Sequence, residues 1–222
     1  MKIYDERDGL SFCLYEDSPV ILSIEKVELF LEFVQSLWRQ FNGMDGFLFL
    51  SDKEKEMKIS KEAEVIVNPF QISLNDKRII NQIYKELSEV ALEYCYEDTI
   101  SINQKLIVYM DRILERIPYP VIYHEELDVI GLFKCFKIQF EEETDFLERI
   151  VSYIRMLHQV CGISVMIFVG LKMYLTKEQL EMLYQTLVYE KIYFIDIENK
   201  FLSKIKSEKN FILDQDLCII EV

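Results

Sequence analysis

The 222-residue chain has little of what makes tight turns and nothing that marks export or membrane insertion. Six glycines and four prolines leave few turn positions, so long helices and strands are expected. No stretch approaches the ~20 apolar residues of a membrane span, and the start MKIYDERDGL does not resemble a secretory signal. The five cysteines never occur in CxxC spacing. These absences predict a cytoplasmic protein with free thiols.

Motifs for nucleotide and hydrolytic chemistry are also missing. Neither GxGxxG nor GxxxxGK[ST] occurs, so the backbone N–H cradle that binds phosphates is not predicted. There is no PD-(D/E)xK-like pattern, no His-Glu zinc motif and no EF-hand loop. We therefore expect that the chain is not an enzyme.

The stretch 163–199 is the clearest structural signal. Residues 163–169 form a short apolar run rich in β-branched side chains, which is typical of a strand buried on both faces. Thr176 and Gln179 have capping-box spacing, so a helix is expected to start near Lys177. A second apolar run at 192–197 completes a predicted βαβ unit with parallel strands.

The rest of the chain predicts an α/β head that is interrupted by helices. We expect Ser23 to cap a helix that runs to about Phe41, and Asn75 to cap the first helix of an insertion. Two amphipathic helices, at about 75–96 and 102–117, are predicted to form an antiparallel hairpin. Further helices are predicted over 125–137 and 141–160, with a brief extended FKIQF segment between them. The predicted domains are the head at 1–72 and 143–222 and the helical insertion at 73–142.

Charge argues against nucleic-acid binding at first sight. The formal net charge of −14 repels phosphates at long range. Binding to DNA would therefore require basic residues to be segregated on one surface.

Four segments together resemble one known family. They are N-P-F-x-I-x-L-N (68–75), I-F-V-G-L-K-x-Y-L-T-x-E-x-L (167–180), Tyr189-Glu190-Lys191-Ile192 and L-D-x-D-L-C (213–218). In this order they resemble the Csn-two family, the type II-A CRISPR-associated proteins needed for acquiring new spacers. The resemblance covers most of the chain, although no single motif is catalytic.

The resemblance implies an α/β, P-loop-like head with a mostly parallel sheet and no working Walker motifs, and an extended α-helical leg. It also implies a homotetrameric ring that binds calcium near the junction of head and leg and holds double-stranded DNA ends without reading their sequence. The CRISPR integrase complex and effector nuclease are the expected protein partners. Two alternatives stay open: a protein-docking scaffold that does not bind DNA directly, and a degenerate nucleotide-binding protein.

Candidate site residues follow from the charges and the resemblance. Lys172 is the best-placed DNA contact, because loops at the carboxyl ends of parallel strands face the ligand side of α/β sheets. The other candidate DNA contacts are Lys134, Lys137, Arg149, Arg155, Lys53, Lys55 and Lys58. The candidate calcium ligands are Glu125, Glu126, Asp128, Glu141, Glu142 and Glu143. Solvated surface lysines and an acidic helix start are the alternative interpretations of these residues.

Overall fold

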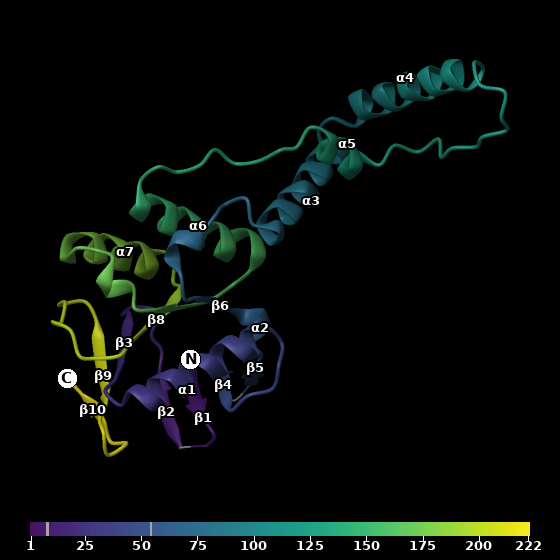
Figure 1. Cartoon of the computed structure of the whole chain (residues 1–222). Coiled ribbons are helices and arrows are strands. Elements are labelled where there is room, and N and C mark those ends of the chain that lie inside the picture. The colour runs from purple at the N-terminus through teal and green to yellow at the C-terminus, as the bar shows by residue number, and fades with distance from the viewer. Residues whose placement is uncertain (8, 54) are drawn as a thin grey trace. The chain divides into compact units, whose positions relative to one another are not determined.

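The computed structural model describes residues 1–7, 9–53 and 55–222, which fold into two compact units. We call Met1–Leu74 with Glu142–Val222 the α/β unit, and Asn75–Glu141 the helical unit. Figure 1 shows the elements of both units along the chain. Among the described residues, no helix combines the length and the apolar character needed to cross a membrane.

A six-stranded sheet with the order β10-β9-β3-β8-β7-β6 forms the centre of the α/β unit. Five neighbouring strands are parallel, and only β10 runs antiparallel to its neighbour. The strands are β3 (Val20–Ile24), β6 (Ala63–Ile66), β7 (Val165–Val169), β8 (Tyr193–Glu198), β9 (Lys209–Leu213) and β10 (Ile219–Glu221). The parallel strands are almost wholly buried because both faces of the sheet are covered.

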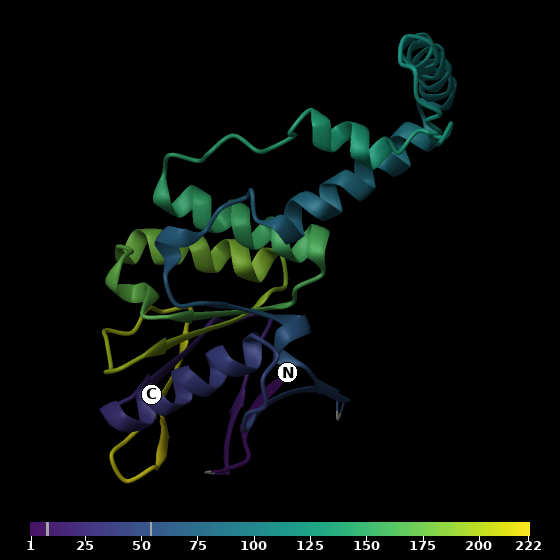
Figure 2. The same ribbon diagram turned by 45° about the vertical axis from the view of Figure 1, so that its right-hand side comes forward.

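One face packs against α1 (Val27–Phe41) and a second, four-stranded sheet with the order β2-β1-β4-β5, and the other face packs against α6 (Phe146–Cys161) and α7 (Lys177–Tyr189) (Figure 2). The strand residues alternate between the two cores. Val165 and Ile167 join the cluster that contains Phe33 of α1, whereas the Phe168 and Phe194 rings lie 5.6 Å apart on the α7 side. The remaining elements of this unit are β1 (Lys2–Asp5), β2 (Leu10–Cys13), α1 (Val27–Phe41), β4 (Leu48–Asp52), β5 (Lys55–Met57), α2 (Ile59–Glu62), η1 (Pro69–Gln71), α6 (Phe146–Cys161), η2 (Leu171–Met173) and α7 (Lys177–Tyr189).

The predicted βαβ unit is confirmed. β7 and β8 pair in parallel, and α7 connects them. Thr176 Oγ1 accepts a hydrogen bond from Gln179 N, and Gln179 Oε1 accepts one from Thr176 N at 2.9 Å, which is the expected capping box. The local sequence therefore fixes where α7 begins.

Several predicted helix starts are wrong. Ser23 lies inside β3, where its backbone pairs with Glu198 on one side and Ile212 on the other, and α1 begins after Lys26. Asp76 rather than Asn75 caps the first helix of the helical unit, because the Asn75 amide pairs with the backbone of Phe140. α6 begins at Phe146 after Asp145. The FKIQF segment is not a strand.

The helical unit is not the predicted antiparallel hairpin. Only Tyr94 and Cys95 separate α3 (Lys77–Glu93) from α4 (Tyr96–Leu114), and α4 extends onward from α3 instead of folding back (Figure 1). The chain returns through an extended segment and then through α5 (Val129–Cys135). Tyr123 donates to Asp111 Oδ1 at 2.7 Å, and Asn103 Nδ2 donates to the Glu125 carbonyl at 3.0 Å. This return segment, and not a second helix, therefore runs beside α4.

Candidate nucleic-acid interface and buried polar cluster

Two buried carboxyl groups mark the carboxyl end of β8. Asp196 and Glu198 alternate with Ile195 and Ile197, which face the opposite core. After β7, Gly170 adopts a left-handed conformation with φ 74° and turns the chain into η2. Leu171 N then donates to Asp196 Oδ1 at 3.1 Å, and Lys172 N donates to Glu198 Oε1 at 3.1 Å. The two carboxyl groups therefore hold the turn that follows β7.

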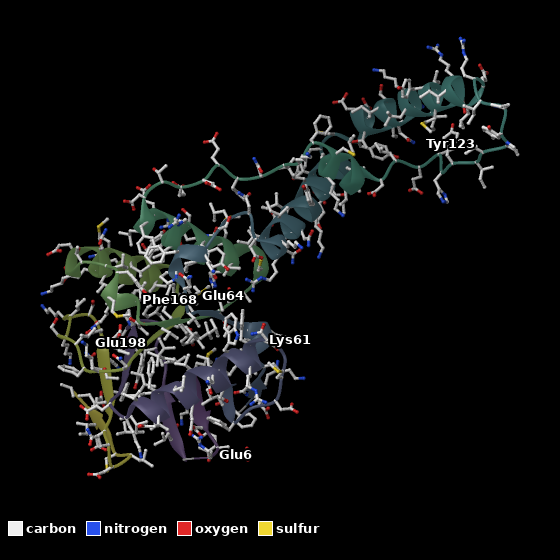
Figure 3. The ribbon with its side chains drawn as sticks, viewed as in Figure 1. Glu6, Lys61, Glu64, Tyr123, Phe168 and Glu198 are labelled. Atoms are coloured by element: carbon white, nitrogen blue, oxygen red, sulfur yellow. The ribbon has the colours of Figure 1, made fainter. Side chains whose placement is uncertain are left out.

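Lys172 and Glu208 form a buried ion pair beside this turn. Lys172 Nζ lies 2.6 Å from Glu208 Oε1, and the two side chains are 4% and 0% exposed. Glu208 also accepts hydrogen bonds from Tyr184 OH at 3.2 Å, Ile205 N at 2.9 Å and Asn210 Nδ2 at 3.2 Å. Four donors thus satisfy the carboxylate, which is the condition for a tolerable buried charge. We call Lys172, Tyr184, Asp196, Glu198, Glu208 and Asn210 the buried polar cluster; Figure 3 labels Glu198 within it.

Burial controls protonation in this cluster. Burial raises the pKa of Asp196, and burial together with the neighbouring Asp196 charge raises the pKa of Glu198 to about 8. The side chains of Asp196 and Glu198 also hydrogen bond to each other. The raised pKa favours the protonated form of Glu198, and a protonated carboxyl group can donate a hydrogen bond to Asp196.

The stability of the fold is expected to fall as the pH rises toward 8. In the unfolded chain, Glu198 releases its proton near its ordinary pKa of about 4.3, whereas the folded chain keeps the proton up to about pH 8. The stabilising contribution is therefore complete at low pH and is lost at up to about 1.4 kcal/mol per pH unit across this window. Glu198→Gln mimics the protonated form and should flatten the decline in melting temperature between about pH 6 and pH 8. Exposed Glu25→Gln is the control, and an unchanged decline in the Glu198 variant would contradict this assignment.

The side chain of Lys172 does not point where the sequence analysis predicted. The residue does lie at the carboxyl end of a parallel strand, as expected. However, its ammonium group is turned inward, where it contacts Glu208 and donates to the Ser203 carbonyl at 3.3 Å. A buried, fully paired ammonium group has no free access to a phosphate, so Lys172 is corrected from a DNA contact to an internal anchor.

The other predicted DNA contacts are divided between the two units. Lys134 and Lys137 are exposed in the helical unit, at α5 and just after it. Lys53, Lys55 and Lys58 are exposed in the α/β unit, in and around β5. Each of these lysines is accessible to a polyanion, but the structure assigns no common role to them.

Arg149 and Arg155 both lie on α6, and both have neighbours within the α/β unit. The Arg149 guanidinium lies 5.5 Å from the Phe146 ring centroid. Arg155 Nε lies 3.2 Å from Glu190 Oε1, so its charge is already matched by a partner.

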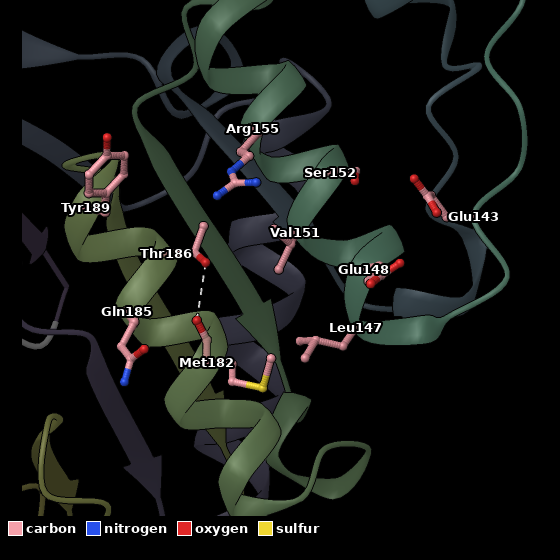
Figure 4. A pocket seen from close by; sticks show the side chains of 10 residues that line it. All are labelled: Glu143, Leu147, Glu148, Val151, Ser152, Arg155, Met182, Gln185, Thr186 and Tyr189. Atoms are coloured by element: carbon pink, nitrogen blue, oxygen red, sulfur yellow. Dashed lines mark hydrogen bonds between the residues drawn. The ribbon is translucent and has the colours of Figure 1, made fainter.

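Arg155 also lines an open groove of about 590 Å³ between α6 and α7 (Figure 4). The groove combines one arginine with Glu143 and Glu148, and the Thr186 hydroxyl in its lining donates to the Met182 carbonyl. Its lining residues are Glu143, Leu147, Glu148, Val151, Ser152, Arg155, Met182, Gln185, Thr186 and Tyr189. The two carboxylates make this groove a poor phosphate site.

The predicted calcium ligands do not fit a metal site where the structure places them. Within residues 1–7, 9–53 and 55–222, no group of three or more His, Cys, Asp or Glu side chains is arranged to hold a metal ion. Asp128 caps α5 by accepting from Gly131 N at 2.9 Å. Glu125 and Glu126 are exposed in the helical unit, which also contains Glu141, whereas Glu142 and Glu143 belong to the α/β unit. Calcium binding thus stays a prediction from the resemblance alone.

Sequence reasoning did not single out one group of exposed basic residues. Lys200, Lys204 and Lys206 lie on the connection between β8 and β9, and all three are exposed. The signal was present in the composition of NKFLSKIKSEK (199–209), which holds four lysines and a single acidic residue in an otherwise acidic chain.

The fold is that of an α/β protein with a mostly parallel sheet and a helical insertion. The buried polar cluster fills the carboxyl end of β8 with the protein's own side chains. A family model described as CRISPR-associated protein (Cas_Csn2) matches residues 40–217. The chain therefore belongs to the Cas_Csn2 family of CRISPR-associated proteins, as the sequence motifs predicted, and membership implies a role in CRISPR adaptation.

A solved structure supports the same fold. The "Crystal structure of Stu0660 of Streptococcus thermophilus" matches with a TM-score of 0.64 at 11% sequence identity, covering 100% of this chain and 76% of that chain. At this identity the likeness concerns the fold alone. A comparison with curated proteins finds no match.

Proposed function

We propose that this protein binds the ends of double-stranded DNA during acquisition of new CRISPR spacers, without reading base sequence and without catalysis. The match of the Cas_Csn2 family model to residues 40–217 carries this proposal. The CRISPR integrase complex and the effector nuclease are the partners that such a role requires.

The working form is proposed to be a homotetrameric ring. Support comes from α4, a 19-residue helix in which no residue is buried within its own chain. It exposes large apolar side chains, among them Val108 and Tyr109, of which Tyr109 is 60% exposed. Contiguous exposed apolar surface favours association, and a two-fold contact between helical units gives dimers that can pair into a closed ring.

The α/β unit is proposed to be a P-loop-like head that has lost nucleotide binding. Only Glu25 and Lys26 separate β3 from α1, which leaves no room for a glycine-rich phosphate loop. The buried polar cluster occupies the carboxyl end of β8, where open α/β sheets usually bind their ligands. We therefore expect ATP and GTP to leave the melting temperature unchanged.

Calcium enters the proposal only as a condition of the test, because the acidic residues as placed do not fit a calcium site. We derive no step of DNA binding from this ion.

Linear duplexes of unrelated sequence are expected to bind with equal affinity, and that affinity should fall steeply with salt. Phosphate contacts release condensed counterions, and no base-reading element is required for them. Fluorescence anisotropy with two labelled duplexes, measured over a salt series with calcium and with a chelator, tests this. The absence of binding at low salt in both conditions would refute DNA-end binding and favour the protein-docking scaffold.

A further inference from the structure

The connection between β8 and β9 crosses the sheet without a helix. β8 and β9 flank β3 and both run parallel to it, so residues 199–208 must pass over β3 to return to the start of β9. Such crossovers are usually helical. Here the segment, drawn in yellow-green beside β9 in Figure 1, contains no helix. We call residues 199–208 the crossover loop.

The buried polar cluster fixes the path of the crossover loop. Lys172 Nζ donates to the Ser203 carbonyl, Ile205 N donates to Glu208 Oε1, and Ser18 Oγ donates to the Ser207 carbonyl at 3.1 Å. Ile205 is buried as well. An irregular segment needs such partners for its backbone groups, and here they hold it in one conformation.

The fixed loop presents positive charge outward. Lys200, Lys204 and Lys206 are exposed, whereas Glu208, the only acidic residue of the loop, is buried and paired with Lys172. At the following position, Lys209 Nζ lies 3.2 Å from the Tyr15 ring centroid.

Neighbouring elements carry acidic residues that partly oppose this charge. Glu16 and Asp17, just before Ser18, and Glu221 of β10 are exposed, and Lys204 Nζ donates to a backbone oxygen of Val222. The four lysines of 200–209 outnumber these three carboxylates. This local excess of positive charge is opposite in sign to the net charge of −14 for the whole chain.

We infer that the crossover loop contacts the phosphates of the bound duplex through Lys200, Lys204 and Lys206, and that Lys172 positions these lysines from within. The inference rests on the proposed DNA binding and names the surface responsible for it. Exposed ammonium groups neutralise phosphates as point charges without reading bases. A loop that is already fixed loses little conformational freedom when it makes such contacts.

The test compares the unmodified protein with a variant in which Lys200, Lys204 and Lys206 are all changed to Gln. Binding to a linear duplex is measured by anisotropy between about 50 and 200 mM salt. Each phosphate contact contributes about −0.9 to the slope of log affinity against log salt concentration, so it adds a factor of about 3.5 to the fall in affinity over this range. For each contact that a bound chain loses in the variant, the total fall should therefore be about 3.5-fold smaller. A matched control changes the exposed Lys2, Lys26 and Lys61 to Gln and should keep the original slope.

The outcomes separate the two proposals. If the unmodified protein does not bind the duplex, DNA binding itself is refuted. If it binds and the crossover-loop variant shows the same affinity and salt slope, the assignment of this surface is refuted while DNA binding stands. Melting temperatures of both triple variants should match that of the unmodified protein, because exposed lysines contribute little to stability.

Discussion

Covalently closed circular DNA is expected to bind this protein at least about tenfold more weakly than linear duplex of the same sequence, a difference of about 1.4 kcal/mol. The reason is topological. If the basic surfaces line the inside of a ring, a duplex reaches them only through a free end. The net charge of −14 per chain discourages binding to the outer surface. Gel-shift or anisotropy competition between relaxed circles and the same DNA after linearisation measures the difference.

Two controls test whether the duplex enters the ring through a free end. Linear DNA with bulky groups on both ends should behave like the circle, and DNA with one free end should behave like open linear DNA. Light scattering at micromolar concentration should give the mass of a tetramer. A monomer, or equal affinity for circles and linear fragments, would rule out the ring.

Lys172→Met is expected to destabilise the α/β unit by about 3–5 kcal/mol, because it leaves a buried carboxylate without its counter-charge. Glu208 would keep Tyr184, Ile205 and Asn210 as donors but would lose the ammonium group of Lys172, which lies 2.6 Å from its carboxylate. This loss is a large part of the 5–15 kcal/mol that usually stabilises a domain. Urea unfolding followed by circular dichroism measures it.

The double variant Lys172→Met with Glu208→Gln distinguishes an ion pair from simple packing. It removes both charges and keeps the hydrogen-bonding groups of residue 208, so it should be more stable than Lys172→Met alone. The exposed Lys177→Met is a matched control in the same region and should change stability by less than about 0.5 kcal/mol. A Lys172→Met protein as stable as this control would show that the pair contributes nothing.

The βαβ unit could be predicted from the sequence because its signals are local. The apolar run before Gly170 and the Thr176–Gln179 capping box lie within the elements that they define. Ser23 shows the limit of this reasoning. A serine before an amphipathic stretch is a good helix cap, but pairing with β8 and β9 keeps Ser23 in a strand. Tertiary contacts with segments far along the chain overrode the local preference.

The site was harder to predict for the same reason. The sequence placed Lys172 correctly at the end of a strand, but its partner Glu208 lies 36 residues further on, beyond β8. Nothing near Lys172 indicates that its ammonium group turns inward. The lysines of the crossover loop were visible in the composition, yet only the structure shows that their single acidic neighbour is buried.

Helical periodicity likewise predicted α3 and α4 but not the direction of the chain between them. Apolar stripes on both helices are compatible with a hairpin or with one bent rod. The contacts of Tyr123 and Asn103 show that the extended return segment lies beside α4. An extended partner leaves α4 with no buried residue.

If the helical units associate as proposed, that exposure makes the folding of α4 depend on protein concentration. α4 buries no residue within its own chain, so surfaces supplied by other copies would add to its stability. Dilution should therefore melt α4 while the sheet, whose strands are buried within a single chain, stays folded. The same sequence would then occur as a partly unstructured subunit when scarce and as a fully ordered one when abundant.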